Sequence, residues 1–454
     1  MDARHPDRNA LESFSRGETS AREERWIEDH LRSGCAVCQL EVDDLLLRML
    51  GSAAFDTGGD AVAREPEEPA WDRLVETLER RLAMVSIERG EAPRLIAELL
   101  GYGPRERTML ARNAGRFQTL AVCEMVIERS FEERFRNTAR AVELAELGLL
   151  LAQRLDGERY GRSVVQDLQA RAWAFLGNAR RMAFDLSGAE AALAEAERVA
   201  ETGSADPLEE ARIFDLRASL LADQGRFEQA AELLEVVIDV YDGLREPHRK
   251  GRAMISKGVF LGYGGWPEEA IRVIRRGLAL VDWDGEPRLV LMARHNLAWF
   301  LNECGRSEEA WQQLQRFRHA YAEYEDPWTQ LRLIWLDSRI AAGLGRFADA
   351  EEGLSEVRRR LLADGRGFDA AMVTLDLANL YLQEGRSAEV KRLAGEMIGL
   401  FLAKDIHHHA AAALTVFQQA AEAERATPRL VREIASYLRR ARRNPALGFE
   451  PAPA

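Results

Sequence analysis

The sequence predicts an all-α protein, built as an α-α superhelix whose repeat is about 40 residues long. Three observations predict it. Glycine recurs at one fixed interval, at Gly225, Gly265, Gly305, Gly345 and Gly385. Alanine stands five positions after each of the first four, and a small residue stands seven positions before all five. One helix–turn–helix unit repeated at a fixed period is the signature of a solenoid.

The small residues indicate where the two helices of a unit cross closely, because a larger side chain would push the backbones apart. The glycine is predicted to end the first helix in the left-handed conformation. The residues seven positions before the glycines are Ala218, Gly258, Ala298, Ser338 and Ala378. Those five positions after them are Ala230, Ala270, Ala310, Ala350 and Val390. This pattern resembles the tetratricopeptide repeat (TPR). The family's usual repeat is 34 residues long, so the helices here are expected to be longer than those of the family. The resemblance covers residues 164–402.

Composition excludes several classes of function. The chain has 454 residues, of which 46% are hydrophobic and 30% charged, as expected of a folded protein without long disordered tracts. Its net charge of −13 argues against general nucleic-acid binding, and no apolar run is long enough to cross a membrane. Four cysteines are too few for a disulfide framework. We therefore expect a cytoplasmic protein.

Residues 1–50 carry a pattern typical of a metal site. A helix is predicted to deliver His30, and a tight turn with Cys35 and Cys38 follows it. Two thiolates and one imidazole can occupy three corners of a zinc tetrahedron. His5 is the candidate for the fourth ligand, with Glu12 or Glu23 as alternatives. The competing interpretation is a metal-free helical hairpin with two buried thiols.

The stretch from Arg16 to Cys38 resembles the zinc-finger domain of bacterial anti-sigma factors. The resemblance rests on Arg16-Gly17-Glu18-Thr19-Ser20 followed by Glu23, on His30-Leu31, and on the Cys-x2-Cys pair at Cys35 and Cys38. The sequence departs from the family by one extra residue between His30 and Cys35. The resemblance implies a structural Zn2+ and a module that captures a protein partner, for which a sigma factor is a candidate.

The remaining segments frame the repeats. Residues 51–70 hold two prolines, three glycines and an acidic cluster, which indicates a linker. Residues 71–163 are predicted to form N-terminal helices and a divergent capping repeat, and residues 403–454 to form C-terminal capping helices and a tail.

The resemblance to TPR proteins implies that the first helix of each unit lines a concave groove. Counting back from the turns places a set of residues on that surface: Arg171, Arg212, Arg252, His295, Trp299, Arg332, Trp335, Arg339 and Asn379. Arginine, tryptophan and asparagine are typical of peptide-binding surfaces, so we expect an acidic or C-terminal peptide segment there. The alternative is that these arginines pair with carboxylates of neighbouring helices and bind nothing.

No catalytic signature is present: the sequence has no His-Glu-x-x-His, no Gly-x-Ser-x-Gly and no phosphate-binding loop. We therefore expect a non-enzymatic bacterial regulator that captures a protein partner through the zinc module, the groove or both. The alternative is a scaffold that docks peptides in the groove, with the zinc module only structural.

Overall fold

The computed structural model describes residues 68–134, 136–402, 408–441 and 447–449, together with single residues in the first 30 positions. The chain divides into two compact units, Met1–Gly90 and Glu91–Ala454. Most of the predicted zinc ligands, namely His5, Cys35 and Cys38, lie outside the described residues, whereas His30 is described and is helical. The zinc site therefore stays a prediction from the sequence.

The described part of the chain is helical and contains no strand, as the sequence predicts. The helices that precede the regular repeats are α4 (Glu68–Gly101), α5 (Pro104–Asn113), α6 (Leu120–Glu133), α7 (Thr138–Ala152) and α8 (Gly157–Tyr160), with a short 3-10 turn, η1 (Gly115–Phe117), between α5 and α6. Within this segment α6 and α7 pack against each other, and α7 packs on the first helix of the repeats.

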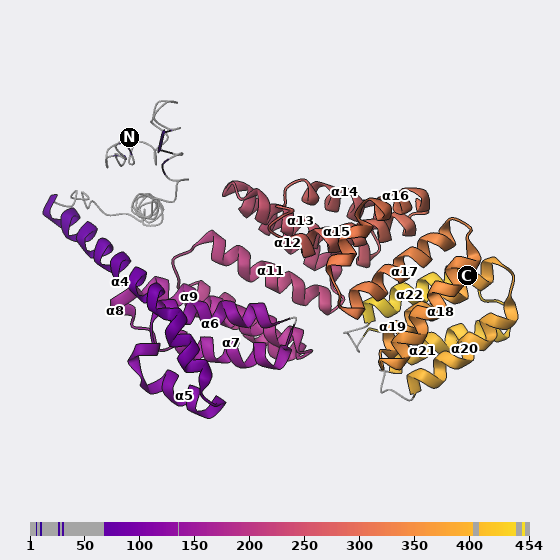
Figure 1. Ribbon diagram of the computed structural model, residues 1–454, viewed down its shortest axis with the longest axis horizontal. Coiled ribbons are helices and arrows are strands. Elements are labelled where there is room, and N and C mark those ends of the chain that lie inside the picture. Colours follow the sequence, from indigo (N-terminus) through magenta and orange to yellow (C-terminus); the bar gives the residue numbers. More distant parts are fainter. Residues whose placement is uncertain are drawn as a thin grey trace, which may run out of the picture. The chain divides into compact units, whose positions relative to one another are not determined.

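Antiparallel helix pairs follow one another through the rest of the second unit (Figure 1). We call the first helix of each pair an A helix: α9 (Arg162–Met182), α11 (Pro207–Asp223), α13 (Pro247–Gly264), α15 (Pro287–Glu303), α17 (Pro327–Gly343), α19 (Gly367–Gln383) and α21 (His408–Glu422). The second is a B helix: α10 (Leu186–Ala200), α12 (Phe227–Gly243), α14 (Pro267–Leu278), α16 (Ser307–Phe317), α18 (Phe347–Ala363), α20 (Ser387–Leu402) and α22 (Pro428–Ala441). A 3-10 turn, η2 (Arg318–Glu323), continues α16.

The predicted turn glycines adopt the predicted conformation. All five glycines that recur at the fixed interval, which we call the glycine ladder, have positive φ, from 72° at Gly385 to 108° at Gly265. The residue after each glycine donates its backbone N–H to a carbonyl five residues earlier, as Arg346 does to Ala341 at 2.9 Å. This hydrogen bond closes the end of the A helix and requires the left-handed residue that glycine supplies without strain.

The small residues of the repeat lie where the A and B helices cross. Ala230, Ala270, Ala310 and Ala350 are all fully buried. A Cβ atom placed on Gly258 would lie 2.5 Å from Cγ1 of Ile274 in the paired helix. Because such a contact is shorter than van der Waals packing permits, a larger residue would separate the helices. The crossing predicted from the sequence is confirmed.

Many A helices also begin in the same way. Pro207, Pro247, Pro287 and Pro327 each occupy the first turn of an A helix, at the same interval as the glycines. Proline is suited to this position because its fixed φ matches the helix and the missing N–H would have no partner there. In these four A helices, the sequence thus specifies both the start, by proline, and the end, by glycine.

The last helix, α22, does not contact only its partner α21. It lies beside α19 (Figure 1). It also contacts α13, which stands several repeats earlier in the sequence. Val431, Ile434, Tyr437, Leu438 and Ala441 are buried along one face of α22. The C-terminal helix therefore packs against an A helix of the preceding repeat and against one of a much earlier repeat. No helix of the described part is long and apolar enough to cross a membrane.

Candidate functional site

The A helices form a surface that we call the inner face, and two cavities lie on it. One, of about 470 Å³, is lined mainly by charged side chains, and we call it the charged cavity. The other, of about 510 Å³, is lined mainly by aromatic side chains, and we call it the aromatic cavity. Both volumes fall within the roughly 300–1,000 Å³ typical of ligand sites.

Arg171, Arg212 and Arg252 line the charged cavity, and each pairs with a carboxylate of the protein itself. Arg171 donates to Glu209 with both arms of its guanidinium, its Nε lying 2.9 Å from Oε2. Arg212 lies 3.1 Å from the same carboxylate, and Arg252 pairs with Glu286. The pairs of Arg171 and Arg252 join the A helix of one repeat to the start of the next.

The ion pairs explain the electrostatics of this cavity. Burial lowers the pKa of Arg171, but the hydrogen bond and the charge of Glu209 outweigh that effect, so its pKa is raised above the ordinary value. Asp215, which lines the same cavity, has a raised pKa because burial disfavours its charge more than Arg252 and Arg181 favour it. Each of the three arginines thus lies beside a carboxylate of the chain itself, as the alternative interpretation of the sequence expects.

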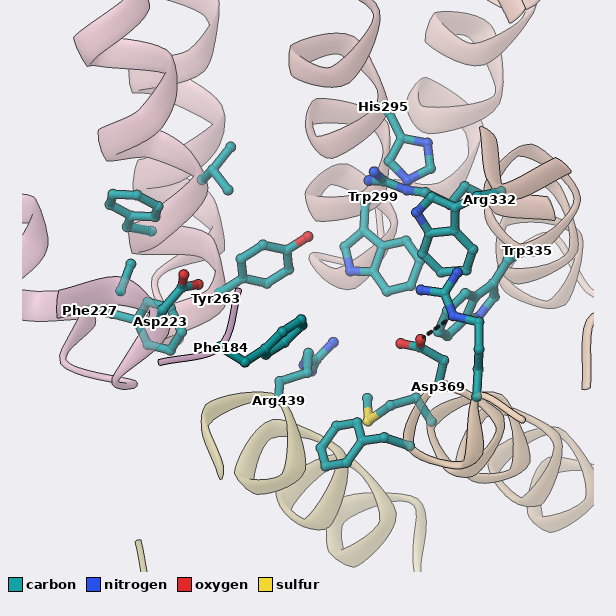
Figure 2. Close-up of a pocket in the computed structure, with 17 residues that line it drawn as sticks. Phe184, Asp223, Phe227, Tyr263, His295, Trp299, Arg332, Trp335, Asp369 and Arg439 are labelled. Carbon is teal, nitrogen blue, oxygen red and sulfur yellow. Dashed lines mark hydrogen bonds and ion pairs between the residues drawn. The ribbon is translucent and has the colours of Figure 1, made fainter. Parts of the chain in front are cut away.

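The aromatic cavity brings together four other predicted residues: His295 and Trp299 from α15, and Arg332 and Trp335 from α17. Figure 2 shows them on one side of the cavity, with Phe227 and Tyr263 opposite. The rings of Trp299 and Trp335 meet edge to face, with centroids 5.5 Å apart and an angle of 81° between planes. Edge-to-face contact is a favourable aromatic geometry.

A polar network behind the two tryptophans holds them in place. Trp335 donates its Nε1–H to Asp376 at 2.7 Å, and the guanidinium of Arg339 lies 3.8 Å from the centre of the Trp299 ring. Arg339 also lies 3.5 Å from both Asp376 and Glu303. Arg339 therefore supports the cavity wall from behind rather than lining it.

His295 is buried and electrically neutral. Its Nδ1 lies 2.7 Å from the hydroxyl of Tyr321. Burial, and secondly the nearby charge of Arg332, holds the pKa of His295 well below its ordinary value. Because this imidazole stays uncharged near neutral pH, it adds a polar group but no charge to the cavity.

Arg332 differs from the other arginines of the predicted set. Its Nη1 lies 3.3 Å from Sδ of Met292, and no carboxylate of the described residues forms an ion pair with it. Asn379, the last predicted residue, lines neither cavity. Its Oδ1 is buried without a hydrogen-bond partner among the described residues.

Several residues of the aromatic cavity were missed by sequence reasoning. Arg439 reaches into it from α22 (Figure 2) and pairs with Glu303 at 2.7 Å. Phe184 lines it from the turn between α9 and α10, with a left-handed φ of 66°. Phe184 stands where the glycine ladder, extended back one repeat, expects glycine, and that departure was the available signal.

Trp328 and Phe368 were also missed, although each is the second residue of an A helix and they stand one repeat apart.

Among the described residues no cluster of histidine, cysteine and carboxylate side chains is arranged to hold a metal ion. Cys123 is buried, and burial raises its pKa, so this thiol is inert.

No family model matches the chain, and no curated protein matches its sequence. Two solved structures are similar to it. One is a Rap protein complexed with Competence and Sporulation Factor, with 12% sequence identity, 69% of this chain and 85% of that chain covered, and a TM-score of 0.54. The other is aspartyl phosphate phosphatase F from Bacillus subtilis, with 12% identity, 93% and 96% covered, and a TM-score of 0.47.

The second likeness is too weak to support a conclusion, whereas the first concerns more than two thirds of the chain. At 12% identity it shows a common fold and nothing about ligands or activity. The anti-sigma resemblance of residues 1–50 finds no support in these comparisons and rests on the sequence motif alone. The chain thus has an all-α superhelical fold of paired helices, similar to that of the Rap protein structure.

Proposed function

We propose that this protein is a non-enzymatic regulator that holds a protein or peptide partner on the inner face of its repeats. The observation that carries the proposal is the aromatic cavity, where predicted A-helix residues from two repeats meet in one concave site. A cavity of this kind offers a large apolar contact area and few polar groups, which is the usual composition of a binding site.

The tryptophans of the cavity have the properties of binding anchors. Trp299 and Trp335 are large, buried for more than nine tenths of their surface, and fixed by Arg339 and Asp376. A rigid wall loses little conformational entropy when a partner binds, so more of the contact energy appears as affinity. The Rap structure, which has a similar fold, was solved with a bound factor, and this supports a binding role by analogy of fold.

The N-terminal module enters the proposal as a second contact. In this proposal, residues 1–50 bind Zn2+ through His30, Cys35, Cys38 and His5 and help to capture the partner, for which a sigma factor is a candidate. The second candidate function is a scaffold, in which the inner face alone binds and the zinc module is structural. It is favoured by the position of both cavities, which lie entirely within Glu91–Ala454.

The test uses the full chain with a photo-crosslinking amino acid at position 372, whose side chain lines the aromatic cavity. Crosslinking in the source cells, followed by mass spectrometry, identifies the partner. Purified partner is then titrated against three variants: Arg212→Glu with Arg332→Glu on the inner face, Cys35→Ser with Cys38→Ser in the module, and Arg272→Glu with Arg359→Glu as a matched control on exposed B-helix positions.

We expect the inner-face variant to lose binding and the control to retain it. Loss of binding in the cysteine variant as well supports the regulator with two contacts, and full retention supports the scaffold. Unchanged binding in the inner-face variant would contradict both candidates.

A further inference from the structure

Arg332 is the one arginine of the predicted set whose guanidinium is left without a carboxylate by the described residues. Arg171 and Arg252 each pair with an acidic residue at the start of the next A helix, Glu209 and Glu286. The A helix that follows Arg332 is α19, and the acidic residue at its start is Asp369. Asp369 does not pair with Arg332 but accepts a hydrogen bond from Arg366 at 3.0 Å. The pairing that neutralises the other arginines is thus diverted here.

The other acidic groups around the aromatic cavity are engaged as well. Asp223 accepts from Arg181 at 2.6 Å, and Glu303 accepts from Arg439 at 2.7 Å. Arg366 is held further by Trp328, whose ring centre lies 3.5 Å from its guanidinium carbon. Each of these acidic side chains has its own arginine, so the cavity carries an excess of one positive charge at Arg332.

A half-buried guanidinium that no carboxylate contacts directly is less favourable than a paired one, because it loses hydration and gains no short-range ion pair. A ligand carboxylate would supply the missing partner, and the planar fork of arginine matches the two oxygens of a carboxylate. The surroundings of Arg332 add the second requirement. Trp299, Trp335 and Met372 line the same cavity and present apolar surface for a large apolar group.

We propose that the aromatic cavity binds a carboxylate attached to a large apolar group, with Arg332 pairing with the carboxylate and the walls of Trp299 and Trp335 receiving the apolar part. This chemistry occurs at the C-terminal residue of a peptide and in a free N-acyl amino acid. The inference rests on the proposed function of the inner face and names the ligand chemistry of one part of it.

The test measures binding of fluorinated probes to the full chain by 19F NMR line broadening. The probes are N-acetyl-4-fluorophenylalanine, its carboxamide, and an acetylated pentapeptide of four glycines ending in 4-fluorophenylalanine with a free carboxylate. We expect the carboxylate to bind about tenfold more tightly than the carboxamide, the factor that one charge-assisted hydrogen bond supplies. Tighter binding of the pentapeptide than of the single amino acid identifies a peptide terminus as the source, and equal binding identifies a free acid.

Two variants assign the effect to Arg332. Arg332→Gln should abolish the preference for the carboxylate, and Arg332→Lys should retain part of it, because lysine keeps the charge and loses the fork. Arg359→Gln, on an exposed arginine of α18, is the control and should bind as the wild type does. Circular dichroism melting of each variant verifies that it is folded.

The inference is overturned if the wild type binds carboxylate and carboxamide equally, if neither probe binds at millimolar concentration, or if Arg332→Gln keeps the preference. Its failure differs from failure of the proposed function. A crosslinked partner that binds Arg332→Gln normally and fails to bind a Trp335→Ala variant leaves the inner face as the binding surface and removes only the role of Arg332.

Discussion

Arg439 donates from Nη1 to Oε1 of Glu303 at 2.7 Å, across 136 residues of sequence. The contact ties α22 to α15. The next residue contributes as well, because a Cβ atom at Gly225 would lie 2.8 Å from the carbonyl oxygen of Arg440. The last turn of α22 therefore lies against the inner face, and Arg439 supplies part of the wall of the aromatic cavity.

Replacing Arg439 should destabilise the protein. Glu303 is half-buried, and the substitution Arg439→Gln removes the nearer of its two arginine partners. Only Arg339, at 3.5 Å, remains beside it. Loss of one member of a fully buried pair costs about 3–5 kcal/mol, and partial exposure together with Arg339 reduces the expected loss to about 1–2 kcal/mol. Urea unfolding followed by circular dichroism measures it.

The matched control is Arg429→Gln, an exposed arginine on the same helix that pairs with Glu433 at 2.9 Å. Exposed pairs contribute little, so this variant should lose less than about 0.5 kcal/mol. If the two variants lost the same free energy of unfolding, the contact between Arg439 and Glu303 would contribute no more to stability than an exposed ion pair does.

His295 should make stability depend on pH. Its pKa in the folded protein is well below the ordinary value, so the unfolded chain binds a proton more readily than the folded one. Stability is therefore complete above the unfolded pKa and falls as pH drops through about 6.5, by up to about 1.4 kcal/mol per pH unit. Unfolding curves at several pH values between neutral and mildly acidic measure the slope.

The variant His295→Gln removes this titration and leaves the other groups unchanged. Its stability should fall less steeply than that of the wild type over the same range, because only the histidine contribution is missing. Parallel curves for the two proteins would mean that His295 is not held neutral in the folded state.

Phe184 should be replaceable by glycine with a gain in stability. Its φ of 66° is left-handed, and its side chain is largely exposed at 68%. Glycine adopts this conformation without strain, so Phe184→Gly should stabilise the fold by about 0.5–1 kcal/mol. Because Phe184 lines the aromatic cavity, the same variant should weaken binding of the fluorinated probes.

Phe184→Ala separates the two effects of that substitution. Alanine removes the aromatic ring but keeps the strained conformation, so it should weaken probe binding without the gain in stability. A glycine variant that unfolds more easily than the alanine variant would argue that backbone strain at this turn is negligible.

The N-terminal motif should bind metal. We expect the purified full chain to contain one zinc ion per molecule and the Cys35→Ser variant to lose it. Inductively coupled plasma mass spectrometry measures the zinc content. Cys304→Ser is the control, since this half-buried thiol stands alone at the end of an A helix and should not affect zinc content. Zinc-free wild-type protein would favour the metal-free hairpin.

Local features of the fold could be predicted from the sequence because they repeat. Gly345 and its equivalents mark the left-handed ends of the A helices, and Gly258 marks a close crossing, which the structure confirms. The positions of Trp299 and Trp335 on one surface followed from the same period. In contrast, the sequence marks Phe184 only as a residue at a position where the repeat expects glycine, which does not predict that it lines the cavity.

The sequence by itself thus determined the helical repeat, its turns and its close crossings, because each depends on residues within one repeat. Only the tertiary structure decided that Arg332 lacks a carboxylate among the described residues while Arg171 has one, since such pairs depend on how side chains of successive repeats reach one another. It also decided that Arg439 meets Glu303. That contact depends on the accumulated rotation of many repeats, which no single repeat contains.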